Sequence, residues 1–355
     1  MAAASTDVSE PETAGTGSKH AQTNDLKEVN VKLLSMTGSL LVAVLALNLG
    51  IAQNLQAQSY PSHPINLIVT MDPGAGADTA GRHLAEELSK ILKTQVIVIN
   101  KPGAGSTLGA DFVVKSKKDG YTLLYATASS VVYTKATNPE VVPFDPVKDL
   151  EPLGLHCFFP VTVVVQQTSP WKTFGELIDY ARKNPGGVRV SVPGQGNIDH
   201  LNVEIIKSLT DTQFTIVPFK GAGAAMTALL GNHVDVAAIS VPLASPHVKA
   251  GKLRNLLLSN KMREFQEVPT LTELGYKQDL LYPWFALYAP AGIPDEVKNV
   301  LVPAIEKAVK NPEMEAKLEK LGFMVEYRSP AELRNLQESD YARARPLAVK
   351  LGLGK

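Results

Sequence analysis

Residues 65–70 read INLIVT and residues 73–78 read PGAGAD, and this apolar run with its glycine-rich turn decides the fold. The apolar run predicts a buried strand. Beyond the turn, Leu84 and Leu88 recur at helical spacing, so a helix is expected from about Thr79. Backbone N–H groups at the start of a helix attract carboxylates and phosphates. We therefore expect a small anion to bind at this turn, although two glycines also occur where a tight turn merely requires them.

A second glycine-rich turn, PGAGS at residues 102–106, follows the apolar run 96–99 and leads into a short helix from about Thr107. A further strand is expected over residues 122–126. Strands and helices that alternate in this way predict a parallel sheet with helices on both faces. Ligands of such sheets bind beyond the carboxyl ends of the strands, where both turns and the polar residues 127–130 fall.

The chain continues with a second α/β unit of comparable size. Its expected strands and helices are strands at 161–165, 188–192, 215–218 and 234–239, and helices at 173–183, 200–209 and 222–230. A last strand-like stretch at 284–289 is followed by two amphipathic helical patterns at 296–310 and 312–321. We place this C-terminal part back on the first unit, because a chain that crosses twice between two lobes makes a natural hinge.

The composition indicates a globular protein with enough residues for one large or two ordinary domains. The 355 residues are 45% hydrophobic, and Lys plus Arg and Asp plus Glu both number 35, so no net charge favours a nucleic acid partner. Cys157 is the only cysteine, which excludes an internal disulfide and any CxxC metal or redox site. We expect its side chain to be buried among apolar neighbours.

The N-terminal residues 1–57 are expected to be absent from the working protein. Residues 1–28 are rich in Ser, Thr, Ala and Gly without an apolar period, which is typical of a disordered tail. Lys32, the apolar run 40–47 and the small residues that follow have the layout of a secretory signal peptide cleaved after Ala57. An uncleaved membrane anchor is the alternative interpretation. The unusual tail in front of the signal suggests that translation starts nearer Val29 or Val31.

Several short motifs resemble, in their order and spacing, the Bug or TctC family of periplasmic solute receptors. The resemblance extends from about Tyr60 to the C-terminus. The motifs are YP at 60–61, PGAGAD at 73–78, NKPGAG at 100–105, DGYTLL at 119–124, PFDP at 143–146, VPFKG at 217–221, AGKLR at 250–254 and VPT at 268–270. No single motif matters as much as their order.

The resemblance implies an α/β fold of the two-lobed periplasmic binding protein type, a Venus flytrap in which each lobe is a mostly parallel sheet flanked by helices. Residues 58–160 and 280–355 would form the first lobe and residues 161–279 the second. Many family members bind small carboxylates between the lobes through backbone N–H groups, hydroxyls and ordered water. The resemblance further implies a periplasmic monomer without a cofactor that serves tripartite tricarboxylate transport or ligand sensing. It leaves open whether a membrane permease of the tripartite tricarboxylate type is the partner.

Carried over residue by residue, the resemblance places a carboxylate site on loops of both lobes. The turn from Gly74 to Asp78 would form the cradle in the first lobe, and loops after three strands would face it from the second. The expected ligand-binding residues are Gly74, Ala75, Gly76, Asp78, Thr127, Ala128, Ser129, Gly194, Asn197, Lys220 and Ser240. The turn from Gly103 to Ser106 is expected to shape the first lobe without touching the ligand.

The chain departs from the family's pattern around the first turn, where it has Met71, Asp72 and Ala75. An acidic side chain beside an anion site would repel the ligand, so we expect Asp72 to point outward. Asp78 is expected to cap the helix and thereby to hold the shape of the cradle. Replacing Gly76 by Asp is expected to abolish binding with little loss of folding.

The rival interpretation is a secreted α/β enzyme that acts on a small carboxylate or a nucleotide. The glycine turns lack the third glycine of a dinucleotide fingerprint, and the sequence contains no P-loop, G-x-S-x-G elbow or HExxH motif. His200 has no second histidine four residues later, so a structural role is expected for it and no metal site is predicted. The sequence therefore favours a receptor over an enzyme.

Overall fold

The strands of the chain lie in two sheets, which the computed structural model describes for residues 60–354. In spatial order, the first sheet holds β11 (Met324–Arg328), β4 (Leu150–Phe158), β10 (Trp284–Pro290), β3 (Thr122–Thr127), β1 (Ile65–Val69) and β2 (Val96–Asn100). The second sheet holds β7 (Thr215–Pro218), β6 (Arg189–Val192), β8 (Val236–Ser240), β5 (Val161–Gln166) and β9 (Leu253–Leu258). Both sheets belong to one compact unit that begins at Tyr60.

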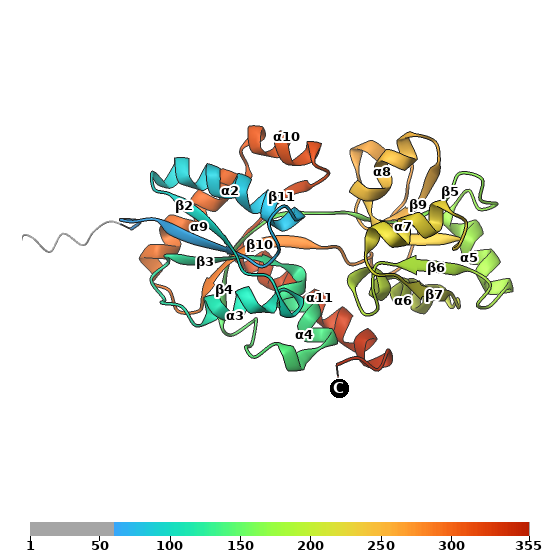
Figure 1. Ribbon diagram of the computed structural model, residues 1–355, viewed down its shortest axis with the longest axis horizontal. Coiled ribbons are helices and arrows are strands. Elements are labelled where there is room, and N and C mark those ends of the chain that lie inside the picture. Colours follow the sequence, from blue (N-terminus) through green and yellow to red (C-terminus); the bar gives the residue numbers. More distant parts are fainter. Residues whose placement is uncertain (1–59, 355) are drawn as a thin grey trace, which may run out of the picture. The chain divides into compact units, whose positions relative to one another are not determined.

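The first sheet is covered by helices on both faces (Figure 1). Its helices and short helical turns are α2 (Gly76–Leu92), η1 (Ala104–Ser106), α3 (Thr107–Val114), η2 (Ser129–Tyr133), α4 (Thr134–Thr137), η3 (Pro139–Val141), α9 (Asp295–Val309), α10 (Pro312–Lys320) and α11 (Pro330–Lys350). Successive side chains of β1 point to opposite faces of the sheet and enter two different hydrophobic cores. Leu67 packs with α2 and α9 on one face, whereas Ile68 packs with α3 and α11 on the other.

The second sheet is organised in the same way. Its helices are α5 (Phe174–Lys183), α6 (Ile198–Thr210), α7 (Ala222–Leu230) and α8 (Val241–Lys249), with the short turn η4 (Arg263–Phe265). Val163 and Val165 of β5 pack with α5 and α6, whereas Val164 between them packs with α7 and α8. The α/β elements expected from the sequence are therefore confirmed, with helix and strand ends within a few residues of the predicted ones.

The expectation that each sheet is mostly parallel is wrong, because both sheets are mixed. In the first sheet, β1 pairs in parallel with β2 and β3, but β10 pairs antiparallel with β3 and β4, and β11 antiparallel with β4. In the second sheet, β6 pairs in parallel with β7 and β8, but β5 pairs antiparallel with β8 and β9. The chain reaches β10 from the second sheet and β5 from the first sheet. Each of these two strands is therefore antiparallel to the strands on both sides of it.

This arrangement gathers the carboxyl ends of the other central strands at the edge where the chain crosses between the sheets. Thr127 at the end of β3 lies opposite Phe285, the second residue of β10, and Ser240 at the end of β8 lies opposite Val161, the first residue of β5. Residues 159–160 alone join β4 to β5. The loops after β3 and β8 therefore lie next to the crossings, and the loops after β1, β6 and β7 leave the sheets at the same edges because these strands run parallel to β3 and β8.

The first sheet contains elements that were not predicted from the sequence, among them β4, β11 and the helix α11, and one predicted helix begins earlier than expected. The apolar stretch at 284–289 is not the last strand, because β11 follows it and pairs with β4. Charged residues such as Glu326 and Arg328 and only partial burial conceal this edge strand from a hydrophobic pattern. Helix α2 begins at Gly76 and not near Thr79, so Asp78 lies within the first turn of the helix.

Candidate functional site

The loop between β1 and α2 presents backbone donors at a helix N-terminus, as the sequence predicts. Ala75 is the N-cap residue, and its carbonyl accepts the first helical hydrogen bond from the Thr79 N–H. The N–H groups of Gly76, Ala77 and Asp78 have no hydrogen-bond partner among the described residues. Three unpaired N–H groups at the positive end of a 17-residue helix form a site that attracts an anion.

Two of the residues expected in the cradle use their N–H groups within the loop itself. The Gly74 N–H donates to Asp78 Oδ2 at 2.9 Å, and the Ala75 N–H donates to the Asp72 carbonyl at 3.1 Å. Gly74 has a φ of +82°, a left-handed conformation that glycine adopts at little cost. Asp72 is exposed, as expected for an acidic side chain beside an anion site.

Asp78 does not cap the helix, and its carboxylate instead holds the loop in place. It is 3% exposed, and besides Gly74 it accepts hydrogen bonds from Asn100 Nδ2 at 2.8 Å and from Arg82 Nε at 3.0 Å. Burial raises the pKa of Asp78, but the hydrogen bonds from Arg82, Gly74 and Asn100 outweigh it and lower the pKa to about 2. Asn100 also donates to the Met71 carbonyl, so the start and the end of the loop are joined. The expected role of Asp78 in shaping the cradle is consistent with these contacts.

Two aromatic side chains, Phe159 and Phe323, pack against this loop at Gly76. A Cβ atom added at Gly76 would lie 2.8 Å from the Phe159 ring and 3.7 Å from the Phe323 ring, and these two rings stack with centroids 4.1 Å apart. Glycine at position 76 is therefore favoured by packing, a role that no sequence pattern indicated. A Gly76→Asp change would require Phe159 to shift, so this packing argues against the expectation that folding would be nearly unchanged.

The second expected part of the first-lobe site follows β3. Thr127 is 6% exposed, and its Oγ1 accepts a hydrogen bond from the Ser130 N–H at 3.2 Å, while Ser130 Oγ donates to the Thr127 carbonyl at 2.7 Å. Ala128 is buried, and Ser129 is exposed. Of the expected contacts here, the Ser129 side chain is thus the one open to solvent.

In the second sheet, the loop after β6 leads into α6 and is ordered by a histidine. His200 Nδ1 accepts a hydrogen bond from the Gly196 N–H at 2.9 Å, and the Asn197 side chain caps the helix by accepting from the His200 N–H at 2.9 Å. Burial lowers the pKa of His200, which favours the neutral ring that this acceptor role needs. The structural role expected for His200 is confirmed, and Gly194 lies partly exposed in the same loop.

Lys220 follows β7 and Ser240 ends β8, two strands of the second sheet that both pair with β6 between them. Lys220 is exposed just before the N-cap residue Gly221 of α7, and Ser240 is the partly exposed N-cap residue of α8. Neither side chain has a hydrogen bond to another described residue. Both are therefore available to a ligand, and their contact with one stays a prediction.

Asp199 is a notable residue that the sequence reasoning did not single out. It lies in the first turn of α6, is 7% exposed, and its Oδ1 has no hydrogen-bond partner among the described residues. Burial raises its pKa to about 7, and the Asn197 amide opposes this shift only weakly, through a 3.4 Å hydrogen bond. In the sequence, Asp199 is simply an acidic residue near the start of a helix, where acidic residues are common, so no pattern marked it.

The second glycine turn supports the first one. Ser106 Oγ lies 3.3 Å from Met71 Sδ, and the Gly105 carbonyl accepts a hydrogen bond from Thr134 Oγ1 at 2.8 Å. Cys157 is free and buried, as expected. Within residues 60–354, no group of three or more His, Cys, Asp or Glu side chains could hold a metal ion, and no helix is long and apolar enough to cross a membrane.

Comparison with known proteins places the chain among receptors. Residues 80–353 match the family described as tripartite tricarboxylate transporter family receptor. The protein BugT of Bordetella pertussis is 33% identical over 264 residues, which cover 74% of this chain and 81% of BugT.

Solved structures share the fold as well. A TctC solute-binding protein from Polaromonas has a TM-score of 0.75 and 28% identity, covering 82% of this chain and 99% of that one. MatC from Rhodopseudomonas palustris with bound malate has a TM-score of 0.64 and 26% identity, covering 81% and 100%. The R. palustris protein Rpa4515 with adipate has a TM-score of 0.67 and 25% identity, covering 83% and 99%. The chain has two β-sheets flanked by helices, and the family match covers most of its length. It therefore belongs to the TctC family of tripartite tricarboxylate transporter receptors.

Proposed function

We propose that this protein is an exported receptor that binds a small carboxylate at the loops where its two sheets meet. The main support for the proposal comes from the start of α2. The N–H groups of residues 76–78 are unpaired there, and hydrogen bonds to Asp78 hold the preceding loop in place. Two members of the fold, MatC with malate and Rpa4515 with adipate, hold carboxylates. Charge-assisted hydrogen bonds from such N–H groups suit a carboxylate because it accepts several of them at once.

The second wall of the site is proposed at three loops of the second sheet. Helices α6 and α7 begin there at residues 198 and 222, and Lys220 adds a positive charge. A dicarboxylate could then be held by one carboxylate at α2 and by the other at these helix starts. Residues 58–160 with 280–355, and residues 161–279, remain the proposed lobes that close on the ligand.

Calorimetry and thermal shift with purified protein test the proposal. The panel contains aliphatic, aromatic and hydroxy acids with one to three carboxylates, including malate and adipate, together with the neutral amide of each. We expect one carboxylate to bind one to one and to raise the melting temperature, while its amide does neither. Failure of every acid to bind, or equal binding by an amide, would contradict the proposal.

We also propose that the protein works in the periplasm with a permease of the tripartite tricarboxylate type. The family match supports the class of transporter. The signal peptide expected before residue 58 lies outside the described residues, as does the cleavage after Ala57. N-terminal sequencing of the protein recovered from the periplasmic fraction should start at Gln58, and a mature N-terminus upstream of Ser39 would contradict export by this signal.

A further inference from the structure

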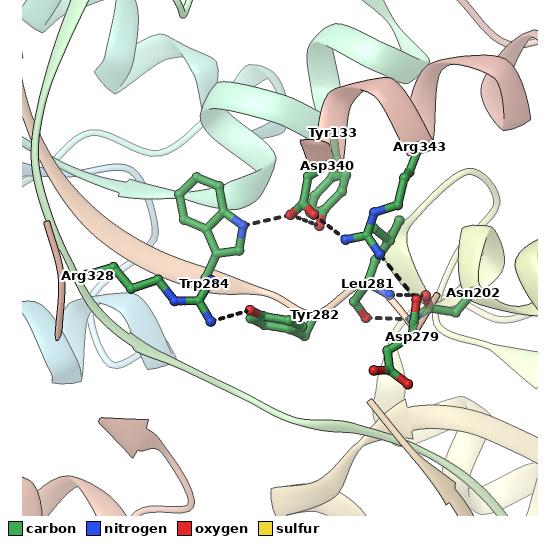
Figure 2. A network of polar contacts seen from close by, with 9 residues as sticks. All are labelled: Tyr133, Asn202, Asp279, Leu281, Tyr282, Trp284, Arg328, Asp340 and Arg343. Carbon is green, nitrogen blue, oxygen red and sulfur yellow. Dashed lines mark hydrogen bonds and ion pairs between the residues drawn. The ribbon is translucent and has the colours of Figure 1, made fainter. Parts of the chain in front are cut away.

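The segment 279–284 returns the chain from the second sheet to the first, and its middle is bound to α6 (Figure 2). Asn202 Nδ2 donates to the Leu281 carbonyl at 2.8 Å, and Asn202 Oδ1 accepts from the Leu281 N–H at 2.7 Å. The Asn202 side chain is 1% exposed and Leu281 is completely buried. A buried amide that satisfies both backbone groups of one residue fixes that residue to its helix, so Leu281 moves with α6.

The same segment is bound on its other side to α11. Asp340 of α11 is 1% exposed and accepts hydrogen bonds from Trp284 Nε1 and from Tyr133 Oη, both at 2.9 Å. Asp340 also pairs with Arg343, whose Nη1 donates to the Asp279 carbonyl at 3.2 Å. Figure 2 shows the tyrosine, the indole and the guanidinium converging on this one carboxylate.

Both partners of the segment lead to the proposed ligand site. Tyr133 is the last residue of η2, a π-helical turn that begins at Ser129, and such turns are frequent at functional sites. Asn202 lies five residues beyond Asn197, the N-cap of α6. A continuous path of hydrogen bonds, the η2 turn, the backbone of the crossing segment and the start of α6 therefore joins the loop after β3 to the loop after β6.

The junction at Asp340 is not fully satisfied in this arrangement. Arg343 Nε is buried and has no hydrogen-bond partner among the described residues. A buried donor without a partner costs free energy in this arrangement.

We propose that Asp340 is a positioning residue that couples a ligand at Ser129 to movement of the crossing segment 279–284. The inference rests on the proposed function. A ligand that draws the η2 turn toward itself moves Tyr133, and Tyr133 moves the carboxylate to which Trp284 and Arg343 are bound. The closing motion of the second sheet then depends on a group that does not touch the ligand.

Tyr133→Phe tests the coupling, because it removes one hydroxyl from Asp340 and leaves Trp284 and Arg343 in place. The matched control is Tyr288→Phe, which removes a buried hydroxyl whose hydrogen bond goes to Gln337 of the same helix at 3.4 Å. Both changes are made in a Trp171→Phe background, so that Trp284 is the only tryptophan left. Malate and adipate are the probes, followed by calorimetry and by tryptophan emission.

We expect Tyr133→Phe to weaken binding about fivefold or more and to remove the ligand-induced change in Trp284 emission. Tyr288→Phe should bind within about twofold of its background protein and keep the emission change. A merely structural role of Tyr133 would lower the melting temperature without the ligand but would leave the emission change intact.

Hydrogen exchange on the unmodified protein provides a second test that needs no variant. Ligand should alter the protection of residues 279–284, and unchanged protection would overturn the coupling even if Tyr133→Phe failed to fold. If the parent protein binds neither probe nor any other acid of the panel, the proposed function fails and the coupling fails with it. If the parent binds and Tyr133→Phe behaves like its background in affinity and emission, the coupling alone is refuted.

Discussion

A negative charge at the start of α2 should weaken carboxylate binding without weakening the fold, and Ala75 is the position that allows this. Ala75 is the N-cap residue, is partly exposed, and has φ −69° and ψ 163°, the extended conformation that N-cap residues adopt. Its side chain makes no capping hydrogen bond because it has no acceptor. Ala75→Asp and Ala75→Asn both add a preferred N-cap side chain, and only Ala75→Asp adds a charge.

The two variants separate the effect of charge from the effect of occupied donors. Either cap would stabilise the helix by about 0.5–2 kcal/mol and would occupy one N–H group that the ligand is proposed to use. The aspartate additionally repels a bound carboxylate. The repulsion between two like unit charges 4 Å apart is about 1 kcal/mol in bulk water and about 4 kcal/mol at the effective dielectric near a protein surface. Ala75→Asp should therefore bind about fivefold to a thousandfold more weakly than Ala75→Asn.

Calorimetry at two salt concentrations and thermal unfolding without ligand measure these effects. We expect affinity to decrease in the order parent, Ala75→Asn, Ala75→Asp, with melting temperatures of both variants equal to or above that of the parent. The gap between the two variants should narrow as salt is raised, because the repulsion is screened. Affinities of Ala75→Asp and Ala75→Asn that agree within twofold would refute the placement of the anion at α2.

Three further changes test the surroundings of the site. Gly76→Ala should lower the free energy of unfolding by about 1–3 kcal/mol because its Cβ would meet the Phe159 ring at 2.8 Å, and chemical denaturation that shows no loss would contradict this packing. Asp78→Ala should lower it by about 1–3 kcal/mol at pH 7, and since the pKa of Asp78 is about 2, the difference from the parent should shrink as the pH falls from about 4 to 2. Asp199→Asn should have the opposite pH dependence. The pKa of Asp199 is about 7 in the folded parent, so its carboxyl stays protonated there at pH values above about 4, where the unfolded chain has already released the proton. The parent therefore loses stability as the pH rises from about 4 to 7. The variant should therefore exceed the parent in melting temperature at pH 8, by a margin that narrows toward pH 5.

The helices and strands that were predicted have local signals, whereas β4, β9, β11, α8 and α11 were not predicted. The apolar run 65–70, the glycine turn after it and the helical spacing of Leu84 and Leu88 describe β1 and α2 without any knowledge of the rest of the chain. The same holds for α7, whose bounds agree with the predicted 222–230. Strand pairing is different, because the direction of β10 depends on the chain having left the first sheet and returned.

The candidate site was predictable in position but not in detail. Loops after parallel strands indicate where a ligand would bind, which pointed to residues 74–78, and the family resemblance added residues 194–197. Which N–H groups stay unpaired depends on Asn100, 22 residues beyond Asp78, because this amide helps to hold the carboxylate that occupies the Gly74 N–H. The bond between Tyr133 and Asp340 joins residues 207 positions apart, and no sequence pattern marks either residue.

The packing of Gly76 gives a physical reason why binding and movement of the sheets should depend on each other. Its N–H is one of the donors proposed for the carboxylate, and its Cα lies against Phe159, one of the two residues that join β4 to β5. The Phe159 N–H in turn donates to the Pro283 carbonyl at 3.0 Å, so the two crossings of the chain are bonded to each other. Any rotation about these crossings moves the ring under the donor. A ligand held by the proposed donor should therefore also restrict the crossings, through contacts separate from those of Asp340.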